Sequence, residues 1–278
     1  MNKEHILLIQ CEDAKGLIFN ISKVIYDNQL NITRNGEYVD GENDQFFFRS
    51  ELEGELDKAQ VLKELRFVLP DGAKVELRIK RKKRILLLAT KEHHCLGDLL
   101  LRHHYGTMNA TIQGVISNHD VLEELVTKYQ IPFYKIGTKG LTREEHEEAV
   151  LKKMEIFDFD YVVLAKYMRI LTPNFVAKFP SKIINIHHSF LPAFIGANPY
   201  RQAYNRGVKI IGATAHFVTD NLDEGPIIYQ DVIRVDHSYN AKSMALAGRD
   251  VERTVFSKAL ELVFKEQVMI NGNKTIIF

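Results

Sequence analysis

An amide and an imidazole lie two positions apart in residues 183–192, which read Ile-Ile-Asn-Ile-His-His-Ser-Phe-Leu-Pro. Apolar and polar residues alternate at first, which predicts an extended strand with Asn185 and His187 on one face, about 7 Å apart. These two groups can converge on one small polar atom, such as a carbonyl oxygen that acquires negative charge. Pro192 cannot extend a sheet ladder, so we expect the strand to end near these residues. Open parallel sheets bind their ligands at such strand ends.

Two carboxylates follow in residues 212–226, where a predicted strand runs into a polar loop. Asp220 and Asp223 lie in this loop, and a Gly-Pro pair then forces the chain to turn. A carboxylate close to His187 would favour the protonated imidazole and exchange protons with it. We therefore expect this loop to return to the Asn185 strand.

The same region offers an alternative, a hydrolytic zinc site formed by His187, His188, His216 and Asp223. Consecutive strand residues point to opposite faces, which makes joint ligation by His187 and His188 awkward. We therefore expect a site without metal. His216 is expected to hold the loop in place and not to transfer protons.

Strands and helices alternate over more than 100 residues after residue 84, which favours a doubly wound, mostly parallel α/β sheet of the Rossmann type. The apolar runs predict strands over residues 85–89, 111–117, 132–136, 161–165, 210–218 and 227–235. Helical periodicity predicts helices over residues 96–105, 121–129, 142–157 and 241–264. Thr142 and Glu145 have the spacing of a capping box at the start of the third helix.

The first 80 residues follow a different order, the ferredoxin-like βαββαβ arrangement. Predicted strands cover residues 5–10, 31–34, 45–50 and 74–80, and predicted helices cover residues 17–27 and 56–65. The run Lys80-Arg-Lys-Lys-Arg84 places five charges in a row, which is typical of a solvated connector. We therefore divide the chain into residues 1–80, a basic linker at 81–84, and residues 85–278.

The composition is that of a soluble globular protein, with 45% hydrophobic and 26% charged residues. The 37 basic and 36 acidic side chains leave no strongly basic surface for nucleic acid. No apolar run approaches the ~20 residues of a membrane span, and residues 1–5 do not begin a secretory leader. These features predict a cytoplasmic protein with no membrane partner. Cys11 and Cys95 are too far apart for a disulfide framework or metal spacing, so we expect both to be reduced and structural.

Three segments together resemble the folate-dependent formyltransferase family. The first is the Asn-x-His-x-Ser-x-Leu-Pro strand at residues 185–192, and the second is the His-x-Val-Thr-Asp-x-x-Asp-x-Gly-Pro loop at residues 216–226. The third is Tyr-Met-Arg-Ile-Leu-Thr-Pro at residues 167–173, which is similar to the family's folate-binding loop. The resemblance runs from about residue 85 to the C-terminus.

This resemblance implies the formyltransferase fold, a folate substrate, and neither cofactor nor metal. It implies catalytic roles for Asn185, His187 and Asp223. It also implies contacts with the pterin side of the folate from Met168, Arg169, Ile170, Leu171, Thr219 and Asp220. His216 and Ser189 would contact these residues and hold them in place without contacting the substrate.

The first 80 residues resemble an ACT domain, a small ligand-sensing module that usually pairs with another copy of itself. The resemblance is carried by the Asp13-x-x-Gly16-Leu17 turn, the helix after it, and Asn31-Ile32. It implies a small amino-acid effector near Asp13, Gly16, Leu17 and Asn31, and a homo-oligomer formed through these domains. From the residues alone, Asp13 and Gly16 fit equally well as turn and helix-start residues without a ligand.

The turn after the first strand of the second half reads Thr90-Lys-Glu-His-His-Cys-Leu-Gly-Asp98, with a single glycine and a glutamate that would repel phosphate. Glycinamide ribonucleotide transformylases of the family have a glycine-rich turn there. Together with the ACT-like half and residues 195–200, Ile-Gly-Ala-Asn-Pro-Tyr, the chain resembles the formyltetrahydrofolate deformylases of the family. That resemblance implies hydrolysis of 10-formyltetrahydrofolate to tetrahydrofolate and formate, which supplies purine synthesis. The alternatives are a formyltransferase acting on an amine, and a non-catalytic folate or amino-acid sensor.

Overall fold

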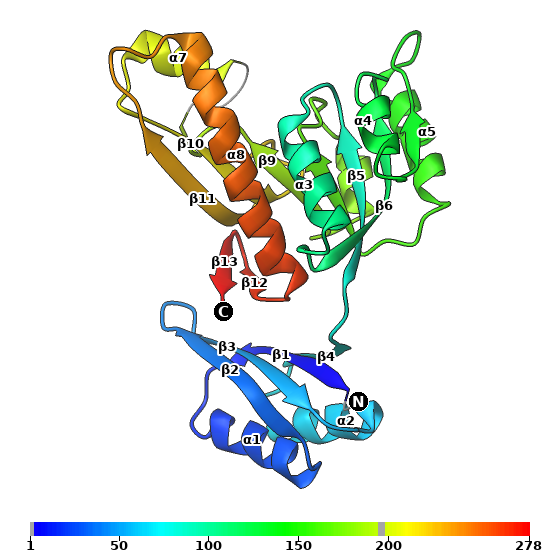
Figure 1. Cartoon of the computed structure of the whole chain (residues 1–278). Helices are drawn as coiled ribbons and strands as arrows, with labels where there is room; N and C mark the ends of the chain where they lie inside the picture. The colour runs from blue at the N-terminus through cyan, green and yellow to red at the C-terminus, as the bar shows by residue number, and fades with distance from the viewer. Residues whose placement is uncertain (1–2, 194–197) are drawn as a thin grey trace. The chain divides into compact units, whose positions relative to one another are not determined.

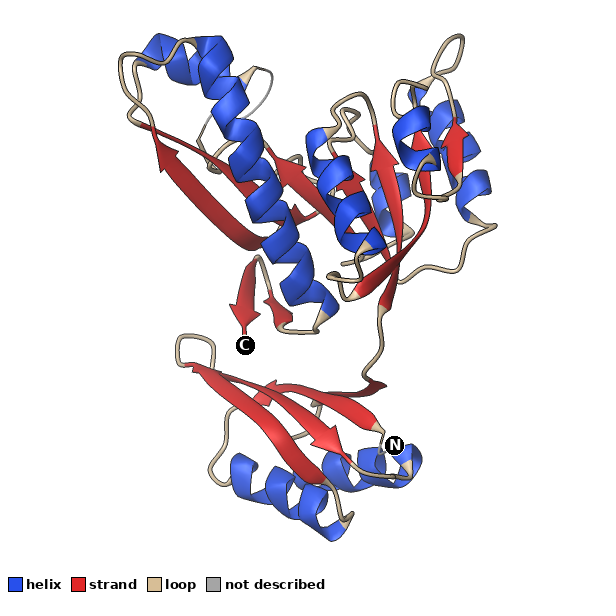
Figure 2. Cartoon of the chain, viewed as in Figure 1, coloured by secondary structure: helices blue, strands red, loops and turns tan. Residues whose placement is uncertain are grey.

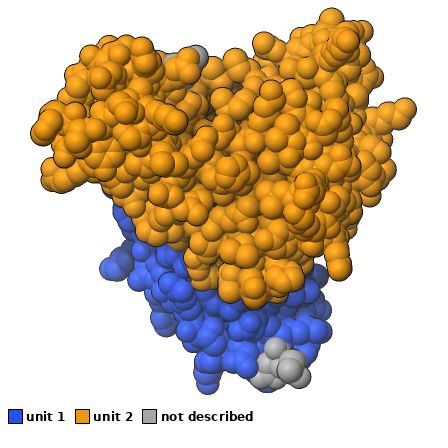
Figure 3. Space-filling model, turned by 45° about the horizontal axis from the view of Figure 1, so that its top comes forward, with its two compact units in different colours: residues 1–81, 266–269, 276–278 blue, residues 82–265, 270–275 orange. Residues whose placement is uncertain are grey.

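The computed structural model describes residues 3–193 and 198–278, and the chain forms two compact units (Figure 3). Unit 1 consists of residues 1–81, 266–269 and 276–278, and unit 2 consists of residues 82–265 and 270–275. We expected all of residues 85–278 to form one domain. Part of the chain's end belongs instead to the first unit.

Unit 1 has the predicted βαββαβ order (Figures 1 and 2). Its elements are β1 (Glu4–Glu12), α1 (Leu17–Asp27), β2 (Asn31–Asp40), β3 (Gln45–Glu53), α2 (Lys58–Val68) and β4 (Lys74–Ile79). The strands form an antiparallel sheet in the order β2-β3-β1-β4. Phe46 and Phe48 of β3 point to one face and join a core with apolar side chains of both helices, such as Ile21 and Leu65. This packing fixes which face of the sheet the helices cover.

The C-terminal residues of unit 1 are held by an arginine on β3. Arg49 is 2% exposed, and its Nε donates a hydrogen bond to the carbonyl of Glu266 at 2.7 Å. Phe278 packs so closely on Gly36 of β2 that a Cβ there would lie 2.8 Å from its ring. The hairpin β12 (Val268–Asn271) and β13 (Lys274–Ile277) joins these two contacts.

Unit 2 contains a mostly parallel seven-stranded sheet, as predicted, in the order β11-β10-β9-β8-β5-β6-β7. Its strands are β5 (Lys83–Ala89), β6 (Ala110–Ser117), β7 (Phe133–Lys135), β8 (Tyr161–Ala165), β9 (Ile183–His187), β10 (Ile210–Phe217) and β11 (Ile227–Arg234). Strands β5 to β9 are parallel, whereas β10 runs antiparallel to both its neighbours. The chain winds outward from β5 through β6 to β7 and returns on the other side through β8, which makes the β5/β8 boundary a topological switch point.

The helices of unit 2 are α3 (His94–His104), α4 (Glu123–Thr127), α5 (Arg143–Met154), α6 (Pro173–Ala177), α7 (Pro199–Arg206) and α8 (Ala241–Phe264). The predicted capping box of Thr142 and Glu145 begins α5. Helices α6 and α7 were not predicted, and each begins with a proline at its first position. Helix α8 packs against β10, β11 and α3 (Figure 1). None of the helices in the described residues is long and apolar enough to cross a membrane.

The basic run is only partly a connector. Lys83 and Arg84, which we assigned to the linker, are the first two residues of β5. The Lys83 N–H donates to the carbonyl of Asn109 at 3.1 Å. The Arg84 guanidinium pairs with the carboxylates of Asp158 and Asp160. Lys83 and Arg84 are therefore part of the sheet, although a run of charged residues is typical of a solvent-exposed connector.

Candidate active site

Strand register brings the first three polar side chains together. His216 of β10 lies directly opposite Asn185 of β9, and Thr214 lies opposite His187. Residues opposite each other in an antiparallel pair share one face of the sheet. Asn185 Nδ2 and His216 Nε2 are 3.2 Å apart, and His216 Nδ1 donates to the Phe217 carbonyl at 2.8 Å. The Nε2 of neutral His216 can therefore accept a hydrogen bond from the Asn185 amide.

The loop after β10 turns sharply and brings Asp223 to the same face. A Cβ on Gly225 would lie 1.9 Å from the carbonyl oxygen of Phe217, so the turn requires glycine. Asp223 itself has a left-handed backbone, with φ of 58°. Its Oδ2 lies 3.2 Å from His187 Nδ1, and its Oδ1 lies 3.7 Å from His216 Nε2. The predicted return of this loop to the Asn185 strand thus follows from the backbone geometry.

The surroundings of Asp223 keep it ionised. Burial by itself would raise the pKa of Asp223, but the hydrogen bond from His187 and the neighbouring His216 imidazole outweigh it and hold that pKa well below its usual range. The His187 Nδ1–H donates to this carboxylate. The other ring nitrogen, His187 Nε2, has no hydrogen-bond partner within the part of the chain that the structure describes. When protonated, that nitrogen can donate to an oxyanion in the adjoining cavity.

A cavity of about 600 Å³ unites the predicted site residues. Its lining includes Asn185, His187, Asp223, His216, Met168, Arg169, Ile170, Leu171, Thr219 and Asp220. Met168 and Ile170 are 56% and 50% exposed, and both line this cavity. They offer an apolar wall for a flat ring, whereas His187 and His216 are buried. All of these side chains belong to unit 2.

Two polar side chains that the sequence analysis missed anchor the loop that carries Met168. The Thr90 hydroxyl, just after β5, accepts the Met168 N–H at 2.9 Å. Glu147 of α5 is buried, accepts the Thr172 N–H at 2.8 Å, and also accepts the Thr172 hydroxyl. The loop is therefore fixed at both ends by groups distant in sequence. A threonine directly after a buried strand was a visible signal, but Glu147 is one of several acids on a polar helix.

His188 lies differently from our expectation. We predicted that His187 and His188 would point to opposite faces, but both line the cavity, and their ring centroids are 5.2 Å apart. The reason is that β9 ends at His187, so strand alternation does not extend to the next residue. Burial, with a contribution from the charge of Lys166, lowers the pKa of His188 to about 4. It is therefore neutral at physiological pH.

Ser189 supports the site less directly than predicted. Its hydroxyl donates to the carbonyl of Ala193 at 2.7 Å, and its own carbonyl accepts from Thr214 at 2.9 Å. Ser189 thus shapes the turn after β9. Of the Ile-Gly-Ala-Asn-Pro-Tyr segment at residues 195–200, residues 195–197 lie outside the described residues.

The predicted effector residues in unit 1 do not form one group within a chain. Gly16 has a left-handed φ of 90° and immediately precedes α1, and the buried Leu17 begins that helix. Asp13 lies beside them, and its N–H donates to the carbonyl of Asp44 at 2.8 Å. Asn31 instead pairs with Glu53, at the opposite end of the sheet. The cause is the 11-residue helix between them, which spans roughly 16 Å.

Both units match known families. Residues 83–260 match the formyl transferase family, and residues 5–69 match the ACT domain. The formyltetrahydrofolate deformylase of Haemophilus influenzae is 52% identical over 277 residues, covering 100% of both chains. The enzyme of that name from Escherichia coli is 55% identical and covers 98% of this chain and 97% of its own.

A solved structure agrees with these matches. The crystal structure of a formyltetrahydrofolate deformylase from Pseudomonas syringae has a TM-score of 0.95 with this chain at 36% identity, and it covers 99% of this chain and 94% of its own. The likeness therefore extends through both units. By sequence and by fold, this chain belongs to the formyltetrahydrofolate deformylase family.

Proposed function

We propose that this chain hydrolyses 10-formyltetrahydrofolate to formate and tetrahydrofolate. The observation that carries the proposal is the arrangement of Asn185, His187 and Asp223 on one wall of a cavity that also has an apolar wall. Among the described residues, His187 Nε2 has no hydrogen-bond partner. The relatives named for this activity match the chain through both units. The formate would serve purine synthesis.

The pterin would lie against the exposed Met168 and Ile170, with Arg169, Leu171, Thr219 and Asp220 completing that side. The formyl carbon would then lie beside Asn185 and His187. As water attacks, the carbonyl oxygen becomes an oxyanion, which the Asn185 amide and His187 Nε2–H stabilise by hydrogen bonds. Loss of one such donor typically costs about 10²–10³ in rate.

Asp223 orients the attacking water and takes its proton. Because the pKa of Asp223 is held low, it keeps that proton only briefly. The tetrahedral intermediate then collapses as the C–N10 bond breaks, and the proton passes to N10 of the departing tetrahydrofolate. Formic acid loses its own proton to water. Asn185, His187 and Asp223 supply the groups that these steps need, so we propose that no metal or cofactor takes part.

The test is formate release from 10-formyltetrahydrofolate by the purified protein without an added amine. We expect turnover, equal with and without a chelator. Activity that a chelator abolishes and zinc restores would favour metal-assisted hydrolysis. Transfer of the formyl group to an added amine would indicate a transferase, and folate binding without turnover would indicate a sensor.

We also propose that unit 1 pairs with its counterpart in another chain and binds a small amino acid. Phe19 and Tyr26 are 70% and 80% exposed on α1, and residues seven apart share a helix face. Light scattering on the full chain should show an oligomer that Tyr26→Glu weakens. A monomeric wild type at assay concentration would contradict this pairing.

A further inference from the structure

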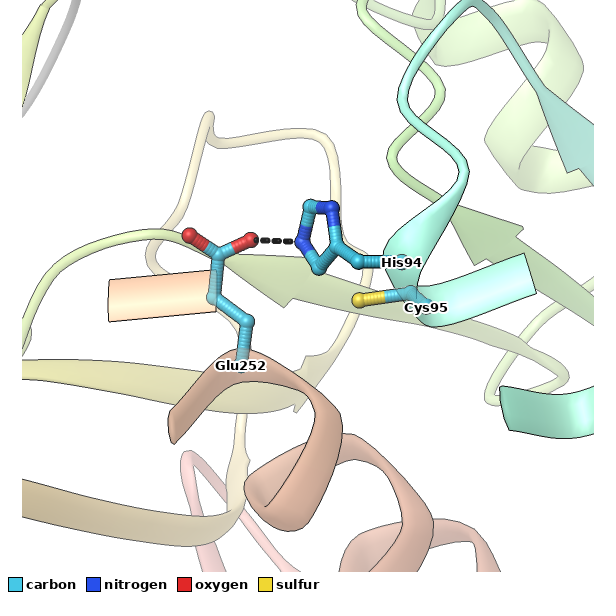
Figure 4. A group of neighbouring side chains, drawn as sticks. All are labelled: His94, Cys95 and Glu252. Carbon is cyan, nitrogen blue, oxygen red and sulfur yellow. Dashed lines mark hydrogen bonds and ion pairs between the residues drawn. The ribbon is translucent and has the colours of Figure 1, made fainter. Parts of the chain in front are cut away.

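A second buried carboxylate lies behind the cavity wall. Glu252 of α8 is 1% exposed, and its two oxygens contact three donors. His94 Nε2 lies 2.7 Å from Oε2 (Figure 4), Lys166 Nζ lies 3.1 Å from the same oxygen, and the Tyr200 hydroxyl donates to Oε1 at 2.6 Å. Lys166 and Tyr200 both line the cavity.

These donors keep Glu252 charged. Burial by itself would raise the pKa of Glu252, but the hydrogen bond from His94, the charge of Lys166 and the hydrogen bond from Tyr200 lower it to about 2. Lys166 is buried as well. The two residues therefore form a buried ion pair, and removal of either partner would leave the other charge uncompensated.

The contacts of Glu252 lead to the catalytic wall. The Tyr200 ring lies 6.1 Å from the His188 ring, which in turn lies 5.2 Å from the His187 ring. Tyr200 is fixed on α8 so closely that a Cβ on Gly248 would lie 2.0 Å from its hydroxyl oxygen. Displacement of Tyr200 would therefore reach His187 through a single intervening ring.

The same place could be read as a metal site. His94, Cys95 and Glu252 are the group of potential ligands within the described residues whose ligand atoms lie within 4.8 Å of one another (Figure 4). However, the Lys166 ammonium already lies against the carboxylate oxygen that faces His94. Burial, and then the charge of Glu252, raise the pKa of the Cys95 thiol. A divalent cation here would face a fixed ammonium and a neutral thiol.

We propose that Glu252 is a positioning residue that holds Tyr200 and neutralises Lys166 at the cavity wall beside His187. The inference rests on the proposed hydrolysis. Glu252 should govern turnover more than folate affinity, because the pterin-side loop has its own anchors in Thr90 and Glu147.

The experiment compares Glu252→Gln, Lys166→Met and the double variant. Each single change leaves an unpaired buried charge, and we expect kcat to fall about 10²-fold, the size of effect that misplacement of a catalytic group produces. KM should change less than about threefold. The double variant leaves no unpaired charge, and we expect its kcat to exceed that of either single variant by about tenfold. Glu261→Gln on α8, whose carboxylate pairs with the exposed Lys265, is the matched control and should match wild type.

Full activity of Glu252→Gln would overturn the proposal. A double variant no better than the single variants would reduce Glu252 to a packing role, and about one zinc per chain, lost in Cys95→Ser, would establish the metal site instead. Should Glu252→Gln fail to fold, Tyr200→Phe removes one hydrogen bond without stranding a charge and should lower kcat several-fold. An inactive wild type would contradict the proposed hydrolysis. The stabilities of wild type, the two single variants and the double variant would still measure the strength of the ion pair.

Discussion

Asp223 and Glu252 are both buried carboxylates with lowered pKa values, but their partners differ in kind. Asp223 lies beside the imidazoles of His187 and His216, and all three side chains line the cavity. Glu252 is paired with the ammonium of Lys166 and is 1% exposed, behind the cavity wall. A carboxylate that lines the cavity can exchange a proton with a bound water. One that is enclosed by its donors can only hold neighbouring groups in position.

The largest expected effect separates Asp223 from its neighbour in the loop. Asp223→Asn keeps the size of the side chain but removes the proposed base, so turnover should fall about 10²–10⁴-fold with little change in folate affinity. Asp220 is exposed at the cavity rim, and Asp220→Asn should weaken folate binding more than turnover. Binding titrations and rates measured separately test both. Equal, mild effects would mean that the two acids are interchangeable.

The next effect concerns Asn185, the proposed oxyanion donor on the same face as Asp223. Asn185→Ala removes an amide hydrogen bond that forms fully only in the transition state, so kcat should fall about 10²–10³-fold. His216→Gln, which keeps a polar group beside Asn185, should cost less. Single-turnover kinetics distinguish the chemical step from product release. A larger loss from His216→Gln would give His216 the catalytic role.

The charge of Glu252 should make the stability of the protein depend on pH in the acid range. The pKa of Glu252 is about 2 in the folded chain and 4.5 for an unperturbed glutamate. The unfolded chain binds more protons between these pH values, so stability decreases as pH falls from about 4.5 to 2, by about 3 kcal/mol from this residue. Glu252→Gln should be less stable at pH 7 and should lose less on acidification. The free energy of unfolding of both proteins can be measured by denaturant titration at each pH. An equal decrease for wild type and Glu252→Gln over this range would argue against the charged pair.

The smallest effect is expected at the pterin-side anchor. Glu147→Gln keeps an acceptor for the Thr172 N–H but weakens the bond with the Thr172 hydroxyl, at a cost of about 1 kcal/mol. KM should rise about fivefold while kcat stays close to wild type, which is the reverse of the pattern expected for Glu252→Gln. Steady-state kinetics of both variants make the contrast. A kcat effect alone would show that the loop also positions the formyl group.

The sequence predicted features whose cause is local. Helix α8 has the predicted bounds because Asn240 caps it and its apolar residues keep one period. The strand with Asn185 and the loop with Asp223 were found because their motifs are contiguous. Glu252 and Glu147 were missed because each looks like an ordinary acidic residue of a helix. The residues that they contact lie far away in the sequence. The C-terminal hairpin had a visible signal, Asn271-Gly272 between two apolar runs, that was overlooked.

The C-terminal residues pack on unit 1, and this affects the order in which the two units can finish folding during synthesis. Domains generally fold as they leave the ribosome, N-terminal first. Here the guanidinium of Arg49 must wait for the carbonyl of Glu266, which is synthesised only after the whole catalytic sheet and α8. Unit 1 therefore begins to fold first and receives its last contacts after the sheet of unit 2 is made, so a ribosome that stops early releases chains in which Arg49 lacks this bond.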